Sequence, residues 1–326
     1  MYLQKLDLRK VVVVSIIIGS FNIRDLNFSN ENKDGEIQKR DFPLIADMII
    51  KEGFDVVAIQ EVNSPMALER IVFFLNKKKN LLHEWECDAS GKAATTNNDP
   101  EGYGFIWNKK RIRLMEIPGK NNPAFYNCAG GKNVIRPPYY GRFTTRGLPG
   151  GSNCEIRLVN THIHDASKEL ERIAEFDVLV KQVLPRICDH NELPILNEMM
   201  PAYTFLLGDY NLRLDKGERA EIRIESITPT TYTKRKRYFK TVQEEKTSLK
   251  TVKTVDAQSD LGDCYKSNYD HFTYELDLIR KLKLHEERIE ALGKYFGKEK
   301  SAQNMLRLYR EKVSDHVPIK MTVDLK

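Results

Sequence analysis

The sequence predicts an α/β protein that folds as one domain. Short β-branched runs alternate along the chain with longer stretches in which apolar residues recur at helical spacing. Of the 326 residues, 41% are hydrophobic and 30% are charged, a composition typical of a globular chain with a sizeable core. No shift in composition marks a linker, so residues 1–326 are interpreted as a single domain. The Thr-, Lys- and Glu-rich stretch 215–266 is predicted to be a surface excursion.

The first element is a strand at 11–23, indicated by the β-branched run at 11–18, which leads directly into Phe21-Asn22-Ile23. Because Lys5, Arg9 and Lys10 precede this run, it also imitates a signal peptide. Asn22 is a candidate active-site residue, and cleavage of the chain after Ser20 would remove most of the strand that supports it. We therefore favour a core strand, and export stays an alternative.

The remaining elements follow from pattern and spacing. Helices are predicted at 41–52, 67–78 and 167–188, and in the charged stretch 277–312. A buried strand is predicted at 54–61, and further strands are predicted at 154–162, 204–208, 269–274 and 317–323. A hairpin is predicted between 103–107 and 112–117, around the polar turn at 108–110.

Charge and cysteine content narrow the function classes. A net charge of +6 suits a polyanionic partner but is far below that of a DNA-wrapping protein. The five cysteines are widely spaced and form no CxxC pair, so neither a zinc site nor a disulfide framework is expected. We expect a monomer in a reducing, cytoplasmic compartment. No apolar run is long enough to span a membrane.

Five polar clusters each stand where a predicted strand ends. Side chains in such positions can project into one shared cleft. They supply carboxylates, carboxamides and imidazoles but no thiolate, which suits a hard cation such as Mg²⁺, with Mn²⁺ or Ca²⁺ as alternatives. The clusters are Asn22, Gln60-Glu61, Thr161-His162, Gly208-Asp209-Tyr210-Asn211 and Asp315-His316.

In this order, the clusters resemble the signature of the endonuclease/exonuclease/phosphatase superfamily. The resemblance runs from about residue 15 to residue 323 and rests on Ser-Phe-Asn-Ile around Asn22, Ile-Gln-Glu-Val around Glu61, Asn-Thr-His ending at His162, Gly-Asp-Tyr-Asn at 208–211 and Ser-Asp-His at 314–316. It implies a four-layer α/β sandwich. Two mixed β-sheets pack face to face, helices lie outside them, and the active site is at one edge.

Within the superfamily, the chain is most similar to the deoxyribonuclease I-like branch. Three features carry this similarity: Glu101 just before Tyr-Gly-Phe, Arg136 in Arg-Pro-Pro, and Asp270 in Tyr-Asp. Two positions where that branch has DNA-gripping side chains hold Asn63 and Asp99 instead. The sequence therefore supports phosphoester cleavage better than a preference for double-stranded DNA. Asn63 also replaces the lysine that is usual in the branch related to exonuclease III.

The resemblance implies roles on both sides of a bound phosphate. Glu61 would be the principal Mg²⁺ ligand, with Asn22 and Asp315 completing or orienting the shell. His162, oriented by Glu101, would neutralise or protonate the leaving-group side.

On the other side, Asp209 and His316 would position and deprotonate the attacking water. The carboxylate that holds His316 is either Asp270 or Asp315, and which histidine is the base stays open. Non-bridging phosphate oxygens would be bound by Asn211, Arg136 and Arg24.

The leading hypothesis is a Mg²⁺-dependent endonuclease or phosphodiesterase acting on DNA. The alternative is a phosphatase of inositol phosphates or similar small molecules, because 208–213 and 229–232 resemble segments of inositol polyphosphate 5-phosphatases. A second alternative is a non-catalytic nucleic-acid-binding module. The basic, aromatic cluster 234–240 is interpreted either as a contact to a nucleic-acid backbone or as a solvated loop.

Overall fold

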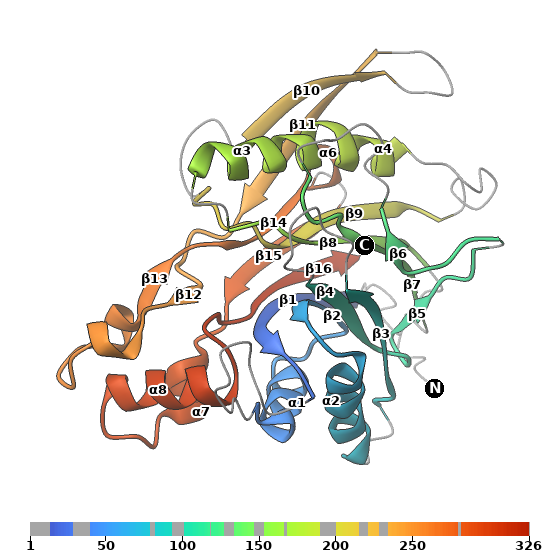
Figure 1. Ribbon diagram of the computed structural model, residues 1–326. Helices are drawn as coiled ribbons and strands as arrows, with labels where there is room; N and C mark the ends of the chain where they lie inside the picture. Colours follow the sequence, from blue (N-terminus) through green and yellow to red (C-terminus); the bar gives the residue numbers. More distant parts are fainter. Residues whose placement is uncertain are drawn as a thin grey trace, which may run out of the picture.

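The protein is a sandwich of two β-sheets with helices on both outer faces (Figure 1). A computed structural model describes residues 14–28, 40–78, 82–92, 101–117, 119–126, 134–146, 153–165, 168–189, 200–214, 221–227, 234–279 and 282–325. The predicted four-layer arrangement is confirmed.

The first sheet has the strand order β15-β16-β1-β2-β4-β3. Its strands β1 and β2 run parallel, and the other neighbouring pairs are antiparallel. In chain order they are β1 (Val14–Leu26), β2 (Val56–Val62), β3 (Trp85–Lys92), β4 (Gly102–Asn108), β15 (Lys283–Arg288) and β16 (Ile319–Leu325).

The second sheet has the order β10-β11-β14-β9-β8-β7-β5, with β6 paired to β7. Here β8 and β9 form the parallel pair. Its strands are β5 (Ile112–Leu114), β6 (Ala124–Phe125), β7 (Tyr139–Thr145), β8 (Glu155–His162), β9 (Ala202–Asp209), β10 (Glu221–Ile227), β11 (Lys234–Val242) and β14 (Asp270–Glu275). A separate small ladder joins β12 (Ser248–Leu249) to β13 (Tyr265–Ser267).

The helices close the sandwich from both sides. Beside the first sheet lie α1 (Phe42–Lys51), α2 (Pro65–Lys77), α7 (Ala291–Phe296) and α8 (Ala302–Lys312) (Figure 1). The second sheet is covered by α3 (Glu169–Val178), a π-helical turn at Leu179–Val183 and α4 (Leu184–Asp189), which together form the predicted helix at 167–188. The other helical pieces in the described part of the chain are short: α6 (Leu276–Ile279) and 3₁₀ turns at Val252–Thr254 and Leu261–Cys264.

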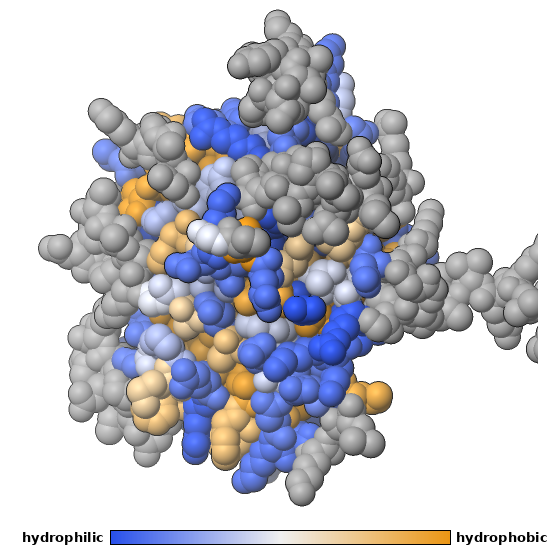
Figure 2. Space-filling view, turned by 90° about the vertical axis from the view of Figure 1, so that its right-hand side faces the viewer, coloured by the Kyte–Doolittle hydropathy of each residue, from blue (hydrophilic) through white to orange (hydrophobic). Residues whose placement is uncertain are grey.

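Three apolar layers hold these elements together. The middle layer lies between the sheets and contains Ile16, Phe105 and Phe205, all with no exposed surface. The outer layers join the first sheet to α1, α2, α7 and α8, and the second sheet to α3 and α4. Alternate residues of each central strand thus face opposite apolar layers, which explains their nearly continuous hydrophobic runs. Seen from the side that carries β3 and β5, the described surface is largely hydrophilic, with apolar residues in small groups (Figure 2).

The predicted hairpin between 103–107 and 112–117 is wrong. β4 pairs with β2 and β3 in the first sheet, whereas β5 pairs with β7 in the second. The turn at 108–110 therefore carries the chain from one sheet to the other. Asn108 fixes this crossing, because its side-chain oxygen accepts hydrogen bonds from the backbone N–H groups of Glu84 and Lys110.

The stretch 215–266 includes β10 and β11, which extend the second sheet. Two predictions in the second half of the chain also need correction. The basic cluster 234–240 lies on β11 and is not a loop. Its Arg237 is buried between Asp189 and Glu275. The stretch 277–312 is helical only in part, because β15 forms an edge of the first sheet.

The first predicted strand is confirmed from Val14 onward as β1, which lies between β16 and β2. Residues 11–13 lie outside the described part of the chain. Among the described residues, no helix is both long and apolar enough to cross a membrane.

Candidate active site

The cleft forms where strand ends of both sheets meet. β8 and β9 run parallel and end side by side at His162 and Asp209, and β14 begins opposite with Asp270. From the first sheet, β1 and β2 bring Asn22 and Glu61 to the same edge. Polar side chains that follow buried strands are thereby gathered from segments far apart in sequence.

This cleft has a volume of about 380 Å³. All the predicted site residues line it except Asn22 and Asp270, which have no exposed surface and lie behind it. The cleft is also lined by His164 and Asp165, which sequence reasoning did not assign to the site.

A buried polar bridge fixes the two halves of the site relative to each other. Gln60, on β2, donates from its side-chain nitrogen to the Asn160 side-chain oxygen on β8 at 2.7 Å. Asn160 in turn donates to the backbone oxygens of Ile59 and Gly104 in the first sheet, at 3.0 and 3.1 Å. Because these groups are fully buried, breaking one bond would leave unpaired polar atoms and cost about 1–3 kcal/mol. Gln60 is one residue before Glu61, and Asn160 is two residues before His162. The bridge between them therefore fixes the position of Glu61 relative to His162.

Backbone conformation explains the glycine that precedes Asp209. Gly208 has a φ of +145°, and a Cβ atom there would overlap the Thr161 carbonyl on β8. Only glycine allows β8 and β9 to approach this closely. Glu61 and Asn211 also have positive φ angles, of 60° and 49°. Such strained backbone in non-glycine residues is concentrated at functional sites.

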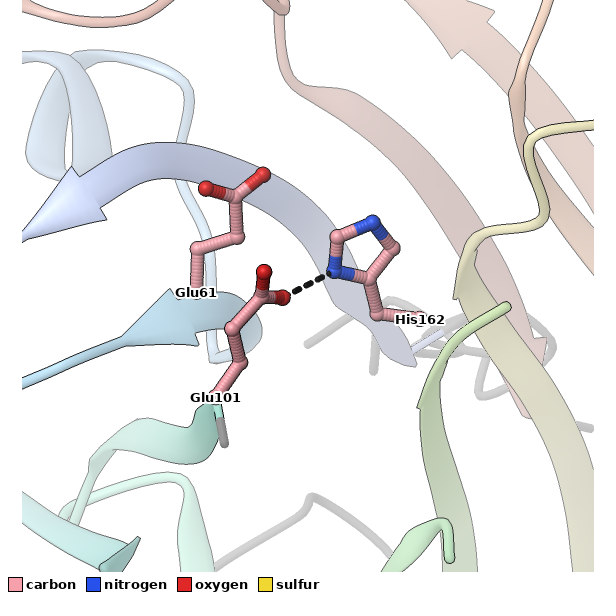
Figure 3. A group of neighbouring side chains, drawn as sticks. All are labelled: Glu61, Glu101 and His162. Carbon is pink, nitrogen blue, oxygen red and sulfur yellow. Dashed lines mark ion pairs between the residues drawn. The ribbon is translucent and has the colours of Figure 1, made fainter. Parts of the chain in front are cut away.

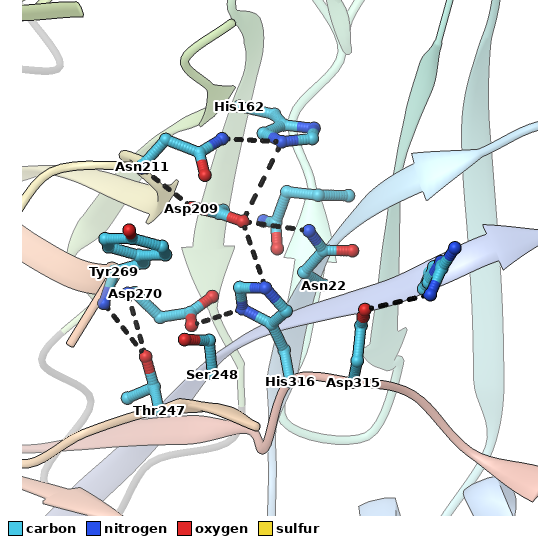
Figure 4. A network of polar contacts seen from close by, with 12 residues as sticks. Asn22, His162, Asp209, Asn211, Thr247, Ser248, Tyr269, Asp270, Asp315 and His316 are labelled. Atoms are coloured by element: carbon cyan, nitrogen blue, oxygen red, sulfur yellow. Dashed lines mark hydrogen bonds and ion pairs between the residues drawn. The ribbon is translucent and has the colours of Figure 1, made fainter. Parts of the chain in front are cut away.

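Asp209 is the centre of the polar network (Figure 4). Its Oδ2 atom lies 3.7 Å from His162 Nε2 and 3.5 Å from His316 Nε2, and it accepts a hydrogen bond from Asn22 Nδ2 at 3.0 Å. Its Oδ1 atom accepts from the backbone N–H of Asn211 at 2.8 Å. Burial and the nearby Asp270 carboxylate raise the pKa of Asp209, while the two histidines oppose that rise.

His316 is held by Asp270, which settles the choice between Asp270 and Asp315. His316 Nδ1 lies 2.7 Å from Asp270 Oδ2, and its Nε2 faces Asp209. Burial alone would lower the pKa of His316. The carboxylates of Asp270, Asp209 and Asp315 outweigh burial and raise this pKa well above the ordinary value.

A second imidazole–carboxylate pair lies across the cleft (Figure 3). His162 Nδ1 is 2.8 Å from Glu101 Oε2, and Arg136 Nη2 donates to Glu101 Oε1 at 3.0 Å. Burial opposes protonation of His162, but the charge and hydrogen bond of Glu101 raise its pKa overall. Arg136 is only 4% exposed, so it backs this pair as well as lining the cleft. Asn211 Nδ2 lies 3.2 Å from His162 Nε2 on the other side.

Glu61 and Asn22 present oxygen atoms suited to a divalent cation. Asn22 Nδ2 donates to Glu61 Oε1 at 2.9 Å, whereas Asn22 Oδ1 is buried with no hydrogen-bond partner among the described residues. Burial, together with the charges of Glu101 and Asp315, raises the pKa of Glu61, a rise that a bound cation would reverse. A buried, unpaired amide oxygen beside such a carboxylate fits a hard metal ion.

Two groups among the described residues have the geometry of metal-ligand clusters. One consists of Glu61, Glu101 and His162, and the other of Asp209, Asp270 and His316. Since Glu101 and Asp270 already pair with histidines, Glu61 is the carboxylate most open to a metal.

Asp315 faces arginines. Its Oδ2 lies 3.2 Å from Arg24 Nη1 and 3.4 Å from Arg310 Nη2. Burial opposes ionisation of Asp315, but His316 and the arginines lower its pKa overall. Arg40, which the sequence prediction missed, donates to the backbone oxygens of Arg24 and Arg310 and so fixes this cationic wall.

Sequence reasoning also missed two supporting residues. Glu175, on α3, is buried and accepts hydrogen bonds from the backbone N–H groups of Ile135, Arg136 and His164. The Thr247 hydroxyl accepts hydrogen bonds from the backbone N–H groups of Tyr269 and Asp270 (Figure 4). Both act on backbone donors, which leave no residue-type signature in the sequence. Asp99 lies outside the described residues.

Comparison with solved structures places the fold. An endonuclease/exonuclease/phosphatase from Bacteroides vulgatus is 12% identical and aligns over 96% of this chain and 100% of its own, with a TM-score of 0.55. The chain has the endonuclease/exonuclease/phosphatase fold. No protein-family model matches the sequence, and no curated protein matches it either.

Two further structures with this fold were solved with nucleotide ligands. ANGEL2, described as a 2′,3′-cyclic phosphatase, is in complex with adenosine-2′,3′-vanadate. It is 12% identical, with 97% of each chain covered and a TM-score of 0.53. D. rerio TDP2, complexed with a single-strand DNA product, is 16% identical. The alignment covers 95% of this chain and 98% of that one, with a TM-score of 0.50. At these identities the similarity establishes the fold, and the chemistry must come from the residues of this chain.

Proposed function

We propose that this chain is a Mg²⁺-dependent phosphoester hydrolase that cleaves phosphodiester bonds in nucleic acid, with DNA as the first candidate substrate. One observation carries the proposal. Asp209 Oδ2 lies between the Nε2 atoms of His162 and His316, and each histidine has its own carboxylate on the opposite ring nitrogen. A purely structural histidine pair would not need this symmetrical arrangement at the wall of a polar cleft.

Glu61 and the buried Asn22 Oδ1 would hold the Mg²⁺ ion, while Asp315 orients that side through Arg24. The ion would neutralise charge on the phosphate and favour an attacking hydroxide at neutral pH. Mn²⁺ has similar ligand preferences and is expected to substitute for Mg²⁺.

The residues on the His316 side would handle the attacking water. Asp209 and His316 Nε2 are close enough to share one water molecule, and Asp270 fixes the imidazole so that Nε2 faces the cleft. Beside a protonated His316, the Asp209 carboxylate would accept the proton of this water, and a positioned base contributes about 10²–10⁴-fold to rate.

The residues on the His162 side would stabilise the leaving oxygen. Glu101 raises the pKa of His162, which favours the protonated form needed to give up a proton. Asn211 and Arg136 add donors and positive charge on the same wall, and Arg24 does so across the cleft. Negative charge that grows on the phosphate oxygens would thus meet fixed donors.

Nucleic acid is favoured as the substrate class because nucleotide ligands occupy two proteins of the same fold, the TDP2 and ANGEL2 complexes. The mild positive net charge of +6 agrees with a polyanionic substrate. The description of ANGEL2 as a cyclic phosphatase supports a second candidate, a phosphatase acting on a small phosphorylated molecule. A non-catalytic binding module is disfavoured, because such a protein has no need for the complete set of paired carboxylates and histidines.

The test incubates the purified chain with Mg²⁺ and a substrate panel of plasmid, single-stranded DNA, RNA and inositol phosphates. His316→Ala is the inactive variant. His285→Ala is the matched control, since the side chain of His285 is 71% exposed on β15. Strand cleavage that EDTA and His316→Ala abolish, and His285→Ala preserves, supports the proposal. Phosphate release from inositol phosphates, with the nucleic acids left intact, would contradict the proposal and support the phosphatase. A folded protein that is inactive on the whole panel would support the non-catalytic binding module.

A further inference from the structure

A short segment, residues 247–249, connects the start of β14, where Asp270 lies, to the stretch before β16 that contains His316. The backbone N–H of Thr247 donates to the Ser267 oxygen at 2.8 Å, just before β14. The Thr247 oxygen accepts from the Val317 N–H at 2.9 Å, next to His316, and Ser248 forms an isolated β-bridge with His316. The segment therefore contacts the backbone on both sides of the pair.

The Thr247 side chain adds a contact on the Asp270 side. Its hydroxyl oxygen accepts hydrogen bonds from the backbone N–H groups of Tyr269 and Asp270, each at 3.1 Å (Figure 4). Thr247 and Asp270 have no exposed surface, so water cannot replace these bonds. Through its hydroxyl and its carbonyl, this residue is bonded to the backbone of Asp270 and to that of the residue after His316.

We propose that Thr247 is a positioning residue for the Asp270–His316 pair. It fixes the backbone of Asp270 so that the carboxylate meets His316 Nδ1 while Nε2 points to Asp209. This inference rests on the proposed function, since it assigns a role in the same site. A displacement of about 1 Å in such a group can cost up to about 10²-fold in rate, although Thr247 itself touches neither substrate nor metal.

The decisive comparison removes only the hydroxyl. Thr247→Val keeps the shape of the side chain, and Thr247→Ser keeps the hydroxyl. Thr251→Val is the matched control, because Thr251 is exposed four residues away. If Thr247→Val does not fold, Thr247→Ala is compared with Thr247→Ser, which differs from it by the hydroxyl alone.

We expect Thr247→Val to lower kcat by about 10- to 100-fold with KM changed less than about twofold, since the displaced group acts on the reacting water. Thr247→Ser and Thr251→Val should stay within about threefold of the wild type. In a His316→Ala background, Thr247→Val should lower kcat by less than about twofold, because the imidazole that Thr247 positions is already absent. The proposal would be overturned if Thr247→Val left kcat unchanged, or if it lowered kcat by the same factor in the wild type and in His316→Ala.

A second measurement does not depend on activity. In Thr247→Val the amide hydrogens of Tyr269 and Asp270 should exchange faster, and the NMR signals of the His316 ring should shift. Neither effect should appear in Thr251→Val. If the wild-type protein is inactive on every substrate, the proposed function fails, but these signals still test the positioning of His316. Ring signals that do not move in Thr247→Val would refute it.

Discussion

Replacement of Glu175 by Gln should change how the stability of the protein depends on pH. Glu175 lies on the buried face of α3 and is 1% exposed, and burial raises the pKa of its carboxyl group to about 7, although three backbone N–H donors and Arg136 oppose the rise. In the unfolded chain the group has its ordinary pKa of about 4.5. Folding therefore takes up a proton at Glu175 between these two values.

The sign and the size of the effect follow from linkage. Since the folded state binds the proton more tightly, the protein loses stability as pH rises from about 4.5 to about 7. At about 1.4 kcal/mol for each pH unit, the loss attributable to Glu175 is about 3 kcal/mol. Above pH 7 the protein has lost all of the stability that the protonated Glu175 contributes. Glutamine does not titrate, so the unfolding free energy of Glu175→Gln should lack this part of the pH dependence.

The assay is urea unfolding of the wild type and Glu175→Gln at intervals from pH 4.5 to 8. Glu171→Gln, exposed on the same helix, serves as the control for removing a carboxylate. All other groups titrate in both proteins, so the difference in unfolding free energy isolates Glu175. We expect the wild type to lose about 3 kcal/mol relative to Glu175→Gln over this range. A difference that stays constant with pH would mean that the three N–H donors keep the carboxylate ionised, and the reasoning would fail.

The remaining predictions concern catalysis and folding. His316→Ala should reduce kcat by about 10²–10⁴-fold without unfolding the protein, as measured by steady-state cleavage and circular dichroism. An activity within tenfold of wild type would remove His316 from the proposed mechanism. Glu61→Gln should raise the Mg²⁺ concentration for half-maximal activity by at least about tenfold, as measured by metal titration, and an unchanged titration would exclude it as a ligand. Gly208→Ala should destabilise the fold by roughly 3 kcal/mol because its Cβ would overlap the Thr161 carbonyl, whereas Gly262→Ala, whose Cβ would have no atom of the described residues within 4 Å, should be neutral in thermal unfolding.

The ends of the central strands could be predicted because each buried run stops at a polar residue. β2 ends next to Glu61 and β9 ends at Asp209, and in both cases the apolar pattern marks the boundary directly. Parallel pairing of β1 with β2 and of β8 with β9 then brings these residues to one edge. The clustering of the candidate residues was therefore accessible from local pattern and topology.

Other features depend on pairing partners that no local pattern specifies. β4 and β5 have the sequence pattern of a hairpin but enter different sheets. The Glu84 backbone N–H donates to the Asn108 side-chain oxygen in the turn between them, and β5 pairs with β7. β15 lies at an edge of the first sheet and, apart from Leu284, consists of charged or polar residues, so its sequence imitates a solvated helix. The choice of Asp270 over Asp315 as the partner of His316 likewise requires the three-dimensional position of β14.

The most direct test of the central claim is single-turnover cleavage of plasmid DNA with Asp209 intact and with Asp209→Asn. Asp209 is the group that both histidines face, and the amide preserves its size while removing its charge. The proposed mechanism predicts Mg²⁺-dependent cleavage by the wild type that stops with EDTA, and a rate at least about 10³-fold lower for a folded Asp209→Asn. Cleavage that persists at a similar rate in Asp209→Asn, or without any divalent metal, would contradict it.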